Sequence, residues 1–449
     1  MTGNYTVCVK DFGAKGDGTS DDSAAFNEAI AALSTSGGMI YVPTGIYIVE
    51  NIVLNVDTLS TLGHRIGFYG DGSANSVLSS SEATNSSFIV KVESHPSEAA
   101  NSVISGVSFR DMQFAILNGL GTPFILKNTA YASFYSCIFR GGSNTFHSDG
   151  SLSSSFINCQ FTDAHDHGLF ADPGSFAYPN QLSFFQCVFG ANGITGLYAI
   201  NPGGIRVFGG SIEGNGIRNG DNSWGGGVVI DSTGGAGNNN CLSLYGVYFE
   251  SNRGMADIMI VHADSAQNIN FNVSDCSFGR GNTIDAVNNI YVNNVTSTTV
   301  TGLVTSCNFH EISNYSPSSQ YRYIAKAGLG ITNIIDTANT FGSILANPAP
   351  GDLLYSSYVT EQRIASDIHT GPTSQDGSIQ IQFRRPYVTP PKIFAQIIDG
   401  GPHLFFHKVT ALSSTCCTVQ VFYTETTSFS PVPASNVTVD VQISGTVAG

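Results

Sequence analysis

Charge is scarce in this sequence, and positive charge is the scarcer kind. Only 11% of the 449 residues are charged, and 18 Lys and Arg stand against 33 Asp and Glu, for a formal net charge of −15. Binding to nucleic acid or to an anionic membrane needs clustered Lys and Arg, so this balance argues against both partners. No apolar run approaches the ~18 residues that a membrane span requires. The sequence therefore predicts neither a nucleic-acid-binding protein nor a membrane protein.

The N-terminus also lacks the pattern of a secretion signal. Its first residues, MTGNYTVCVKDFG, contain no basic segment followed by an apolar stretch. Tryptophan is nearly absent, with one residue in the chain, whereas 50 glycines accompany abundant Asn, Ser and Thr. Such a composition favours short strands and turns over long helices. We expect a β-rich protein without a signal peptide.

One seven-residue word recurs in the first half of the chain. It reads SFYSCIF at 133–139, SFINCQF at 155–161 and SFFQCVF at 183–189. We interpret each word as one alternating strand whose Phe and Cys, two residues apart, share a face. The last Phe of the word recurs every 22 to 37 residues, at Phe114, Phe139, Phe161, Phe189, Ile212, Phe249, Phe278, Phe309 and Phe341. A repeat of this period is typical of a solenoid.

Most repeats contain a second short strand, such as GLFA, GVVI or DIMIV, with Gly and Asn turns around it. Short strands in this order predict the rungs of a right-handed parallel β-helix, in which equivalent residues stack ~4.8 Å apart. The Phe and Cys residues would then fill the inside of the tube. We expect the cysteines of this position to be free, buried thiols: Cys137, Cys159, Cys187, Cys276 and Cys307. Cys416 and Cys417 are adjacent, so in a strand they would point to opposite faces.

The open end of such a tube needs a cap. The segment TSDDSAAFNEAIAAL predicts a capping helix with Asp21 or Asp22 at its N-cap, and the following GGMIYVPTGIYIV predicts the first strands. The apolar helix face would contain Ala25, Phe26, Ala29, Ile30 and Leu33. Asp17, Thr19, Asp21 and Glu28 match four positions of a calcium loop, but Asp22 stands where such a loop needs Gly. We predict no metal and no cofactor.

The segment VKDFGAKGDGTSDDSAAFNEAIAAL, followed by GGMIYVPTGIY, resembles the N-terminal signature of the pectate-lyase-3-type β-helix proteins, above all bacteriophage tailspikes and capsule depolymerases. The resemblance implies a homotrimeric virion protein that binds and usually cleaves a bacterial surface polysaccharide, acting outside the host cell. Only about eight residues precede the signature, which leaves no room for a virion-anchoring head domain, so we expect either that this chain begins at the receptor-binding part or that a separate phage tail adaptor protein attaches it.

The repeat pattern stops near residue 345. We expect the signature and capping helix at 1–40, the catalytic β-helix at 41–345, a linker at 346–361 and a C-terminal β-sandwich at 362–449. Runs such as HLFFHKVTAL, TVQVFYTE and NVTVDVQIS predict antiparallel strands for this sandwich. Their order resembles H-type lectin domains, which implies trimerisation or carbohydrate binding.

Two glutamates follow equivalent core positions in consecutive repeats. Glu213 and Glu250 should therefore lie on the outer surface with carboxylates roughly 5 to 8 Å apart. Glycosidic hydrolysis needs such a pair, one group as general acid and the other as nucleophile or base. The resemblance adds that tailspike endoglycosidases have similar pairs. The alternative is two solvated or Arg-paired acids, with Arg253 as their partner. The nearby row of Asn192, Asn215 and Asn252 is interpreted as structural.

Further candidates lie in two segments. Trp224 is predicted to stack on a sugar or to pack at a subunit interface. The segment FTDAHDHGLFAD provides Asp163 or Asp166 as a third catalytic acid, whereas its two histidines would line the substrate groove. A metal site of Asp163, His165 and His167 would require an extended turn. The predicted substrate-binding set is Trp224, His165, His167, Arg253, Arg140 and Asp231. Asp231 belongs to a possible row with Asp149, Asp172 and His262.

Three functions remain open: an endo-acting glycoside hydrolase, a polysaccharide lyase and a non-catalytic receptor-binding fibre. A lyase removes the proton beside a uronate carboxylate and needs a cation to neutralise that carboxylate. The candidate surface is rich in acids and poor in basic groups, which favours hydrolysis. Its basic residues are Arg140, Arg206, Arg218 and Arg253.

Overall fold

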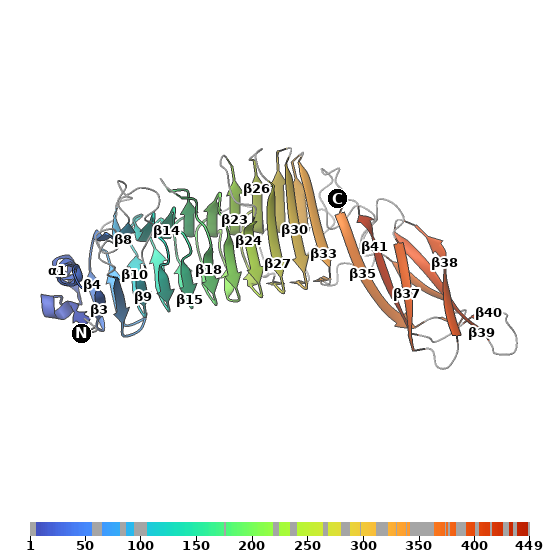
Figure 1. Cartoon of the computed structure of the whole chain (residues 1–449), viewed down its shortest axis with the longest axis horizontal. Coiled ribbons are helices and arrows are strands. Elements are labelled where there is room, and N and C mark those ends of the chain that lie inside the picture. Colours follow the sequence, from blue (N-terminus) through green and yellow to red (C-terminus); the bar gives the residue numbers. More distant parts are fainter. Residues whose placement is uncertain are drawn as a thin grey trace.

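A computed structural model shows a long tube followed by a small sandwich (Figure 1). The structure describes residues 6–55, 65–80, 87–93, 106–174, 177–218, 224–233, 240–263, 268–279, 288–296, 298–310, 322–328, 330–337, 339–341, 363–372, 374–375, 378–382, 392–399, 404–413, 415–424, 431–433 and 438–447. The predicted linker at 346–361 lies outside these ranges. In the described ranges, no helix is both long and apolar enough to cross a membrane.

Three parallel sheets, here called A, B and C, form the wall of the tube. Sheet A contains β1 (Thr6–Cys8), β3 (Gly38–Val42), β6 (Ile66–Gly70), β9 (Ser108–Arg110), β12 (Ser133–Tyr135), β15 (Ser155–Ile157), β18 (Leu182–Phe185), β21 (Ile205–Phe208), β24 (Asn240–Tyr245), β27 (Ile269–Ser274), β30 (Thr299–Thr305) and β33 (Ile331–Thr337). Sheet B contains β2 (Asp17–Asp21), β4 (Gly45–Ile48), β7 (Ser76–Ser79), β10 (Gln113–Ile116), β13 (Ile138–Gly141), β16 (Gln160–Thr162), β19 (Val188–Gly190), β22 (Ser211–Glu213), β25 (Tyr248–Glu250), β28 (Ser277–Phe278), β31 (Asn308–Phe309) and β34 (Thr340–Phe341). Sheet C contains β5 (Ile52–Asn55), β8 (Phe88–Glu93), β11 (Thr122–Lys127), β14 (Asn144–Asp149), β17 (His167–Asp172), β20 (Thr195–Ile200), β23 (Gly226–Ser232), β26 (Ala256–His262), β29 (Asn288–Asn294) and β32 (Arg322–Ala327). The predicted parallel β-helix is confirmed.

The repeated word is two strands, so its interpretation as one strand was wrong. In SFYSCIF, β12 ends at Tyr135 and β13 begins at Ile138, and Ser136 between them has a φ of 50°. Asn158 and Gln186 occupy the same corner of the next words with φ values of 53° and 52°. A single left-handed residue turns the chain sharply enough to move it from sheet A to sheet B. One coil therefore runs from A through this corner to B, and then through a longer turn to C.

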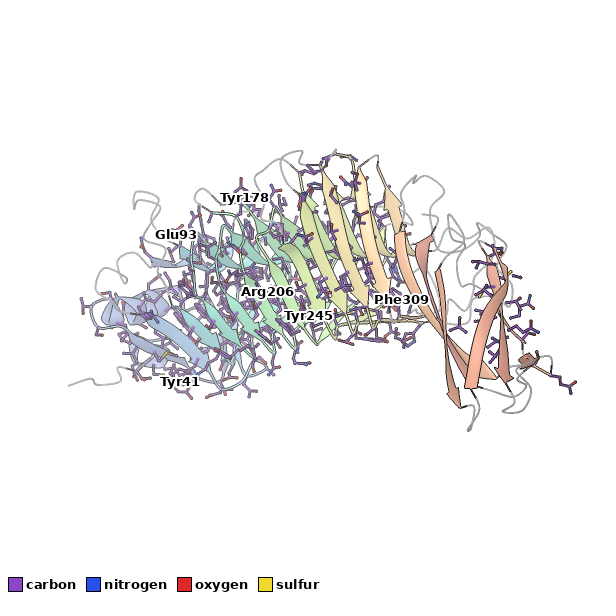
Figure 2. All side chains as sticks on the ribbon, turned by 45° about the vertical axis from the view of Figure 1, so that its right-hand side comes forward. Tyr41, Glu93, Tyr178, Arg206, Tyr245 and Phe309 are labelled. Atoms are coloured by element: carbon purple, nitrogen blue, oxygen red, sulfur yellow. The ribbon has the colours of Figure 1, made fainter. Side chains whose placement is uncertain are left out.

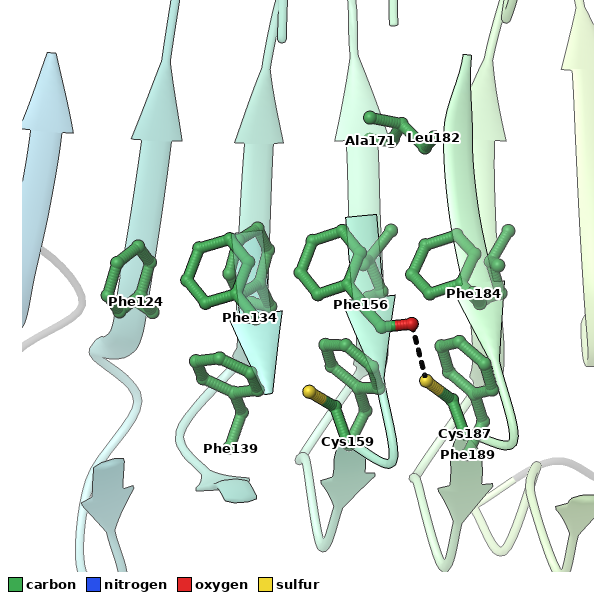
Figure 3. Packing of buried hydrophobic residues seen from close by; sticks show 14 of the residues in the cluster. Phe124, Phe134, Phe139, Phe156, Cys159, Ala171, Leu182, Phe184, Cys187 and Phe189 are labelled. Atoms are coloured by element: carbon green, nitrogen blue, oxygen red, sulfur yellow. Dashed lines mark hydrogen bonds between the residues drawn. The ribbon is translucent and has the colours of Figure 1, made fainter. Parts of the chain in front are cut away.

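The core consists of stacked ladders, as the repeat predicts. The register pairs Phe139 with Phe161 and Phe161 with Phe189 in sheet B, and their rings stack with centroids 5.2 and 4.8 Å apart. The Phe ladders and the buried thiols face one another inside the tube (Figure 3). Cys187 donates a hydrogen bond from Sγ to the carbonyl of Phe156 at 3.4 Å. Full burial of a Phe side chain stabilises the fold by roughly 1.5 to 3 kcal/mol, so repeated Phe positions dominate the stability of each coil.

Helix α1 (Ser23–Leu33) lies at the N-terminal end of the tube, as predicted (Figure 1). Its Phe26 is fully buried and meets the ring of Tyr47 edge-on at 5.6 Å. Asp22 is the N-cap residue, but its carboxylate accepts hydrogen bonds from the backbone N–H groups of Lys15 and Gly16 instead of capping the helix. The short helix η1 (Val9–Phe12) and strands β1 and β2 precede α1. The signature itself therefore forms the first coil, earlier than the predicted first strands.

The C-terminal strands form two antiparallel sheets. One contains β35 (Arg363–Pro372), β41 (Thr438–Val447) and β37 (Lys392–Asp399), and the other contains β36 (Ser378–Gln382), β39 (Cys416–Thr424), β38 (Leu404–Leu412) and β40 (Pro431–Pro433). The predicted sandwich is confirmed, although the repeat analysis missed β35. This strand pairs with β33 in parallel, so sheet A continues from the tube into the sandwich.

Candidate functional site

Glu213 and Glu250 lie side by side on the outside of sheet B. They end strands β22 and β25, and the parallel register places Glu213 directly opposite Glu250. The residue before each glutamate, Ile212 or Phe249, is fully buried, so both carboxylates leave the core on the outer side and are partly exposed. Adjacent parallel strands are ~4.8 Å apart, so this register places the two glutamates on neighbouring strands, and a carboxylate separation of roughly 5 to 8 Å stays a prediction.

Tyr248 precedes this pair on the same outer face. Burial raises the pKa of its phenol, and a hydrogen bond to the Glu250 carboxylate and the charge of Glu213 raise it further. The hydroxyl therefore stays protonated at neutral pH and remains a donor to Glu250. The sequence analysis did not include Tyr248, although its position two residues before Glu250 places it on the same side of the strand.

A ladder of buried asparagines fixes the turn that follows the two glutamates. Asn215 donates from Nδ2 to Asn252 Oδ1 at 2.9 Å and to the carbonyl of Phe189 at 2.9 Å. Asn252 in turn donates to the carbonyl of Ile212 at 2.8 Å. These amides satisfy backbone groups between coils, so the structural role predicted for the Asn row is confirmed. Both glutamates thus stand immediately before a turn that buried hydrogen bonds hold in place.

A glycine of sheet C leaves the space that this ladder occupies. A Cβ on Gly196 would lie 2.9 Å from the Asn215 amide nitrogen and 2.8 Å from the carbonyl oxygen of Gly227. Contacts under 3.0 Å do not occur at real Cβ atoms, so a side chain there would push the ladder away. The packing of the Asn215 side chain in the turn therefore depends on the missing side chain of Gly196 in sheet C.

Arg253 does not pair with the two glutamates. No ion pair within 4.0 Å joins it to either carboxylate in the described part of the chain, and its backbone N–H donates to the carbonyl of Asn215. The alternative in which Arg253 pairs with Glu213 or Glu250 therefore finds no support. Among the described residues, no Lys or Arg forms an ion pair with either carboxylate.

The two other candidate acids are neutralised by neighbours. Arg140 contacts Asp163 at 2.6 Å, and Arg218 contacts Asp166 at 2.9 Å. Burial alone would raise the pKa of Asp166, but the hydrogen bond from Ser143 and the contact with His165 hold it below the usual value. An aspartate that stays ionised cannot donate a proton to a leaving group. This pairing favours a supporting role for Asp163 and Asp166, which remain candidates as a third catalytic acid.

The segment from Asp163 to His167 is not extended, so these residues do not share a face. Asp163 is itself a corner residue with a φ of 62°. His165 Nδ1 lies 2.8 Å from Asp166 Oδ1, whereas His167 Nδ1 lies 2.8 Å from Thr195 Oγ1. Each side chain has its own partner, which removes the geometric basis for the two-His, one-carboxylate metal site.

The outer face of sheet C holds a row of rings that the sequence analysis missed. The register aligns His147 with Phe170 and Phe170 with Tyr198, with centroids 5.1 and 5.3 Å apart. Trp224, from the turn between β22 and β23, meets Tyr198 edge to face at 4.8 Å and remains 38% exposed. Phe170 and Tyr198 each stand between a buried Leu and a buried Ala. This alternation was the available sequence signal, because every second residue of a half-exposed strand points outward.

Tyr198 also joins the predicted binding residues His167 and Asp231. Its hydroxyl donates to Asp231 Oδ2 at 3.1 Å, and its ring lies 5.1 Å from that of His167. Burial lowers the pKa of His167 to about 4, so this ring is neutral at physiological pH. Burial, followed by the charge of Asp231, raises the pKa of Tyr198. Trp224 and Asp231 follow His167 by 57 and 64 residues in the sequence. The three side chains nevertheless meet around one tyrosine.

The expected acidic row on sheet C is only partly right. Asp149 pairs in register with Asp172, and Asp231 follows in the same column after Ile200. Asp172 contacts His147 at 2.8 Å. His262 does not belong to this row, because it aligns with Ser232 and is fully buried, with Nε2 2.7 Å from Thr298 Oγ1. Counting residues without the register misplaced His262 by one position, which moves a strand residue to the opposite face.

The fold and these surface residues can be compared with known proteins. Residues 6–241 match the family described as rhamnogalacturonase A/epimerase, pectate lyase-like. The chain belongs to this family. The match includes the signature, Glu213 and the ring row on sheet C, and it ends before Glu250.

Individual proteins are similar to this chain over short stretches or at low sequence identity. The mannuronan C5-epimerase AlgE2 of Azotobacter vinelandii is 42% identical over 71 residues, which are 16% of this chain and 7% of the epimerase. The chain therefore spans only a small part of that relative. The solved structure of ORF18 of Geobacillus virus E2 has a TM-score of 0.51 at 17% identity, covering 97% of this chain and 75% of that chain. The tailspike gp49 of Acinetobacter baumannii bacteriophage Fri1, a capsular polysaccharide depolymerase, has a TM-score of 0.45 at 10% identity, covering 99% and 86%.

Proposed function

We propose that this chain is the receptor-binding and polysaccharide-cleaving part of a phage tailspike, and that it acts as an endo-glycoside hydrolase. The observation that supports this most is the register of Glu213 opposite Glu250 on the outside of sheet B, with no ion pair to either carboxylate among the described residues. Family membership and the signature support a carbohydrate substrate. The two carboxylates supply the acid and the base that cleavage of a glycosidic bond requires.

The neighbouring groups assign a role to each glutamate. Tyr248 donates a hydrogen bond to Glu250, and such a donor suits a carboxylate that works in its ionised form. Glu250 is then the nucleophile or the base that activates water, and Glu213 donates its proton to the leaving oxygen. Glu213 takes the role of the acid because Glu250 is the member of the pair beside the Tyr248 hydroxyl.

The ring row on sheet C is the proposed sugar-binding surface. It lies across the asparagine turn from the glutamates, because each coil passes from sheet B through that turn to sheet C. Trp224 and Tyr198 offer apolar ring surface, whereas Asp231, His167 and the Arg218–Asp166 pair offer polar groups nearby. Apolar platforms with a few oriented polar groups are the usual means of holding a sugar. A polysaccharide chain would cross from the platform to the carboxylate pair.

Elimination is the alternative reaction. Of the basic residues on this surface, Arg140 and Arg218 already neutralise Asp163 and Asp166, so they are poorly suited to neutralise a uronate, and Arg253 is the arginine that a lyase would use. We further propose a homotrimer that acts on a capsule, exopolysaccharide or O-antigen outside the host, attached to the virion through a tail adaptor protein. The C-terminal sandwich would serve trimerisation or carbohydrate binding.

The test is the product of digestion of purified bacterial surface polysaccharides. New reducing ends without ultraviolet-absorbing unsaturated sugars would support hydrolysis, and unsaturated ends would show a lyase. An unchanged chain length with retained binding would show a receptor-binding fibre. Glu213→Gln and Glu250→Gln should each abolish cleavage, whereas Glu93→Gln, an equivalent change in a Lys91-paired glutamate of sheet C, should not. Full cleavage by both site variants would refute the assignment.

A further inference from the structure

The outer face of sheet A is unusually apolar. Six of its strand residues are large, hydrophobic and exposed, whereas the described tube strands of sheets B and C contain one such residue each, Ile46 and Val53. The six residues on sheet A, with their exposed fractions, are Tyr135 at 41%, Phe185 at 38%, Tyr245 at 36%, Leu303 at 36%, Ile331 at 50% and Ile335 at 42%. Exposed apolar surface that is concentrated on one face marks an interaction site.

The described outward positions on the strands of this face contain no acid, and two carboxylates, Asp111 and Asp275, stand at the corners after β9 and β27. From β9 to β33, the outward positions that the structure describes are apolar residues, Ser, Thr, Asn and two arginines, Arg110 and Arg206. Sheet B presents Glu213 and Glu250 outward, and sheet C presents Asp149, Asp172 and Asp231 among others. In a chain with a formal charge of −15, a long strip free of Asp and Glu is the surface where two copies can meet with the least repulsion.

The rings on this face are poorly placed to hold a sugar. The register aligns Phe185, Phe208 and Tyr245, and the rings stack at 5.0 and 5.3 Å with interplanar angles of 7° and 9°. Phe208 thus has a ring on each side, and the column presents ring edges to the outside. Sugar recognition uses the apolar ring face. A ridge of ring edges beside a column of serines instead suits packing against protein side chains. Figure 2 labels Arg206 and Tyr245, which lie on neighbouring strands of this face.

The strip is large enough to contribute to a stable interface. Nine strands from β9 to β33, spaced ~4.8 Å apart and about 13 Å wide, cover on the order of 500 Å² in projection. A standard protein interface buries ~800 Å² on each partner. Since sheet A continues into the sandwich through β35, the same side of the molecule can provide further contact area.

We infer that the outer face of sheet A, from β9 to β33, is the surface through which copies of this chain pack against one another. The apolar ridge is buried where two copies meet, and no carboxylate from the described outward strand positions of this face enters the contact. This inference deepens the homotrimer of the proposed function, but it depends on the chemistry of the face and not on catalysis. It leaves the carboxylates of sheet B and the rings of sheet C open to substrate.

The test is the mass of the full chain in solution and its resistance to urea. The parent should have a multiple of the 47.3 kDa chain mass by size-exclusion chromatography with light scattering. Phe185→Asp with Tyr135→Asp should give 47.3 kDa or should dissociate at a lower urea concentration than the parent. Ile46→Asp on sheet B, at 50% exposure, is the matched control and should leave both values unchanged. Circular dichroism checks that each variant is folded.

A second variant covers the case in which the double change prevents folding. Arg206 is already exposed and charged, so Arg206→Glu introduces an acid on the face without burying a charge. It should also lower the urea concentration of dissociation. A monomeric parent, or sheet A variants with the parent's mass and dissociation midpoint, would overturn the inference. Sheet A variants that lose polysaccharide binding but keep the parent's assembly would also overturn the inference. They would show that this face binds sugar. A trimeric parent without hydrolytic activity would refute the proposed function and leave this inference intact.

Discussion

The outer faces of sheets A and B differ, although the same coils form both. In the coil of β21 and β22, sheet A presents Arg206 and Phe208 outward, and sheet B presents Glu213. Inside the tube the two sheets are alike, because each contributes a ladder of Phe and aliphatic residues. Core packing therefore constrains only every second residue of a strand, and the outward residues of each face are free to differ. In this chain, one face became acidic and another acid-free.

The largest expected effect is the difference in kcat between a carboxylate substitution on sheet B and one on sheet C. Glu250→Gln should lower kcat for polysaccharide cleavage by roughly 100- to 10,000-fold, because it removes the nucleophile or base and leaves the shape unchanged. Asp172→Asn, which changes a carboxylate paired with His147, should lower kcat by less than about 10-fold. The measurement is the release of reducing ends. Equal losses in the two variants would show that the acids of both faces act together.

The next comparison is between the inside and the outside of the tube. Phe161→Ala should lower the free energy of unfolding by about 3 to 5 kcal/mol, because the residue is fully buried between two stacked rings. Phe185→Ala removes a ring that is 38% exposed and should cost a free monomer much less. Urea denaturation monitored by circular dichroism gives both values. A large cost for Phe185→Ala that depends on protein concentration would show that the outer ring is buried in the assembly.

The asparagine ladder links folding to the candidate site. Asn215→Ala removes a donor from the Phe189 carbonyl and from Asn252, and should cost about 1 to 3 kcal/mol because buried acceptors lose their partner. The turn after Glu213 would loosen, so cleavage should also slow. Unchanged cleavage by a destabilised Asn215→Ala protein would show that this turn does not position the glutamates.

The ring platform should affect binding more than catalysis. Trp224→Ala should weaken polysaccharide binding by about 5- to 10-fold, since an aromatic contact contributes roughly 0.5 to 1.5 kcal/mol beyond its buried area. It should raise KM and leave kcat close to the parent value. Ile217→Ala removes an exposed side chain from the same turn and is the control. A lower kcat with an unchanged KM would move Trp224 from binding to the reaction itself.

The last comparison concerns the pH dependence due to His167. Burial lowers its pKa from 6.5 to about 4, so the folded protein resists protonation of a group that the unfolded chain protonates readily. Stability should therefore be unaffected above pH 6.5 and should fall as the pH drops from 6.5 towards 4. His167→Gln should reduce this loss, which thermal unfolding at pH 7 and pH 5 would measure. An identical pH dependence in the variant would show that His167 does not contribute.

The fold was largely predictable because core positions repeat. The recurrence of Phe139, Phe161 and Phe189 gave the correct ladder and the alignment of Glu213 with Glu250. The corner inside the word was not predictable, because a polar residue such as Ser136 gives little sign of a positive φ. The ion pairs were not predictable either. Arg253 was considered as a partner of either glutamate in the alternative to a catalytic pair, whereas in the described part of the chain the arginines that form ion pairs are Arg140 and Arg218, each with an aspartate.

What the sequence by itself determined is the order of residues along each ladder. Alternation within a strand and the period between coils can be read from the sequence. Because the core is tightly packed, they determine which residues stack inside the tube. What the tertiary structure decided is which side chains meet outside the tube. Tyr198, Trp224, His167 and Asp231 come together because a turn brings Trp224 back over β20, and the direction of a turn depends on the packing of the coils beneath it.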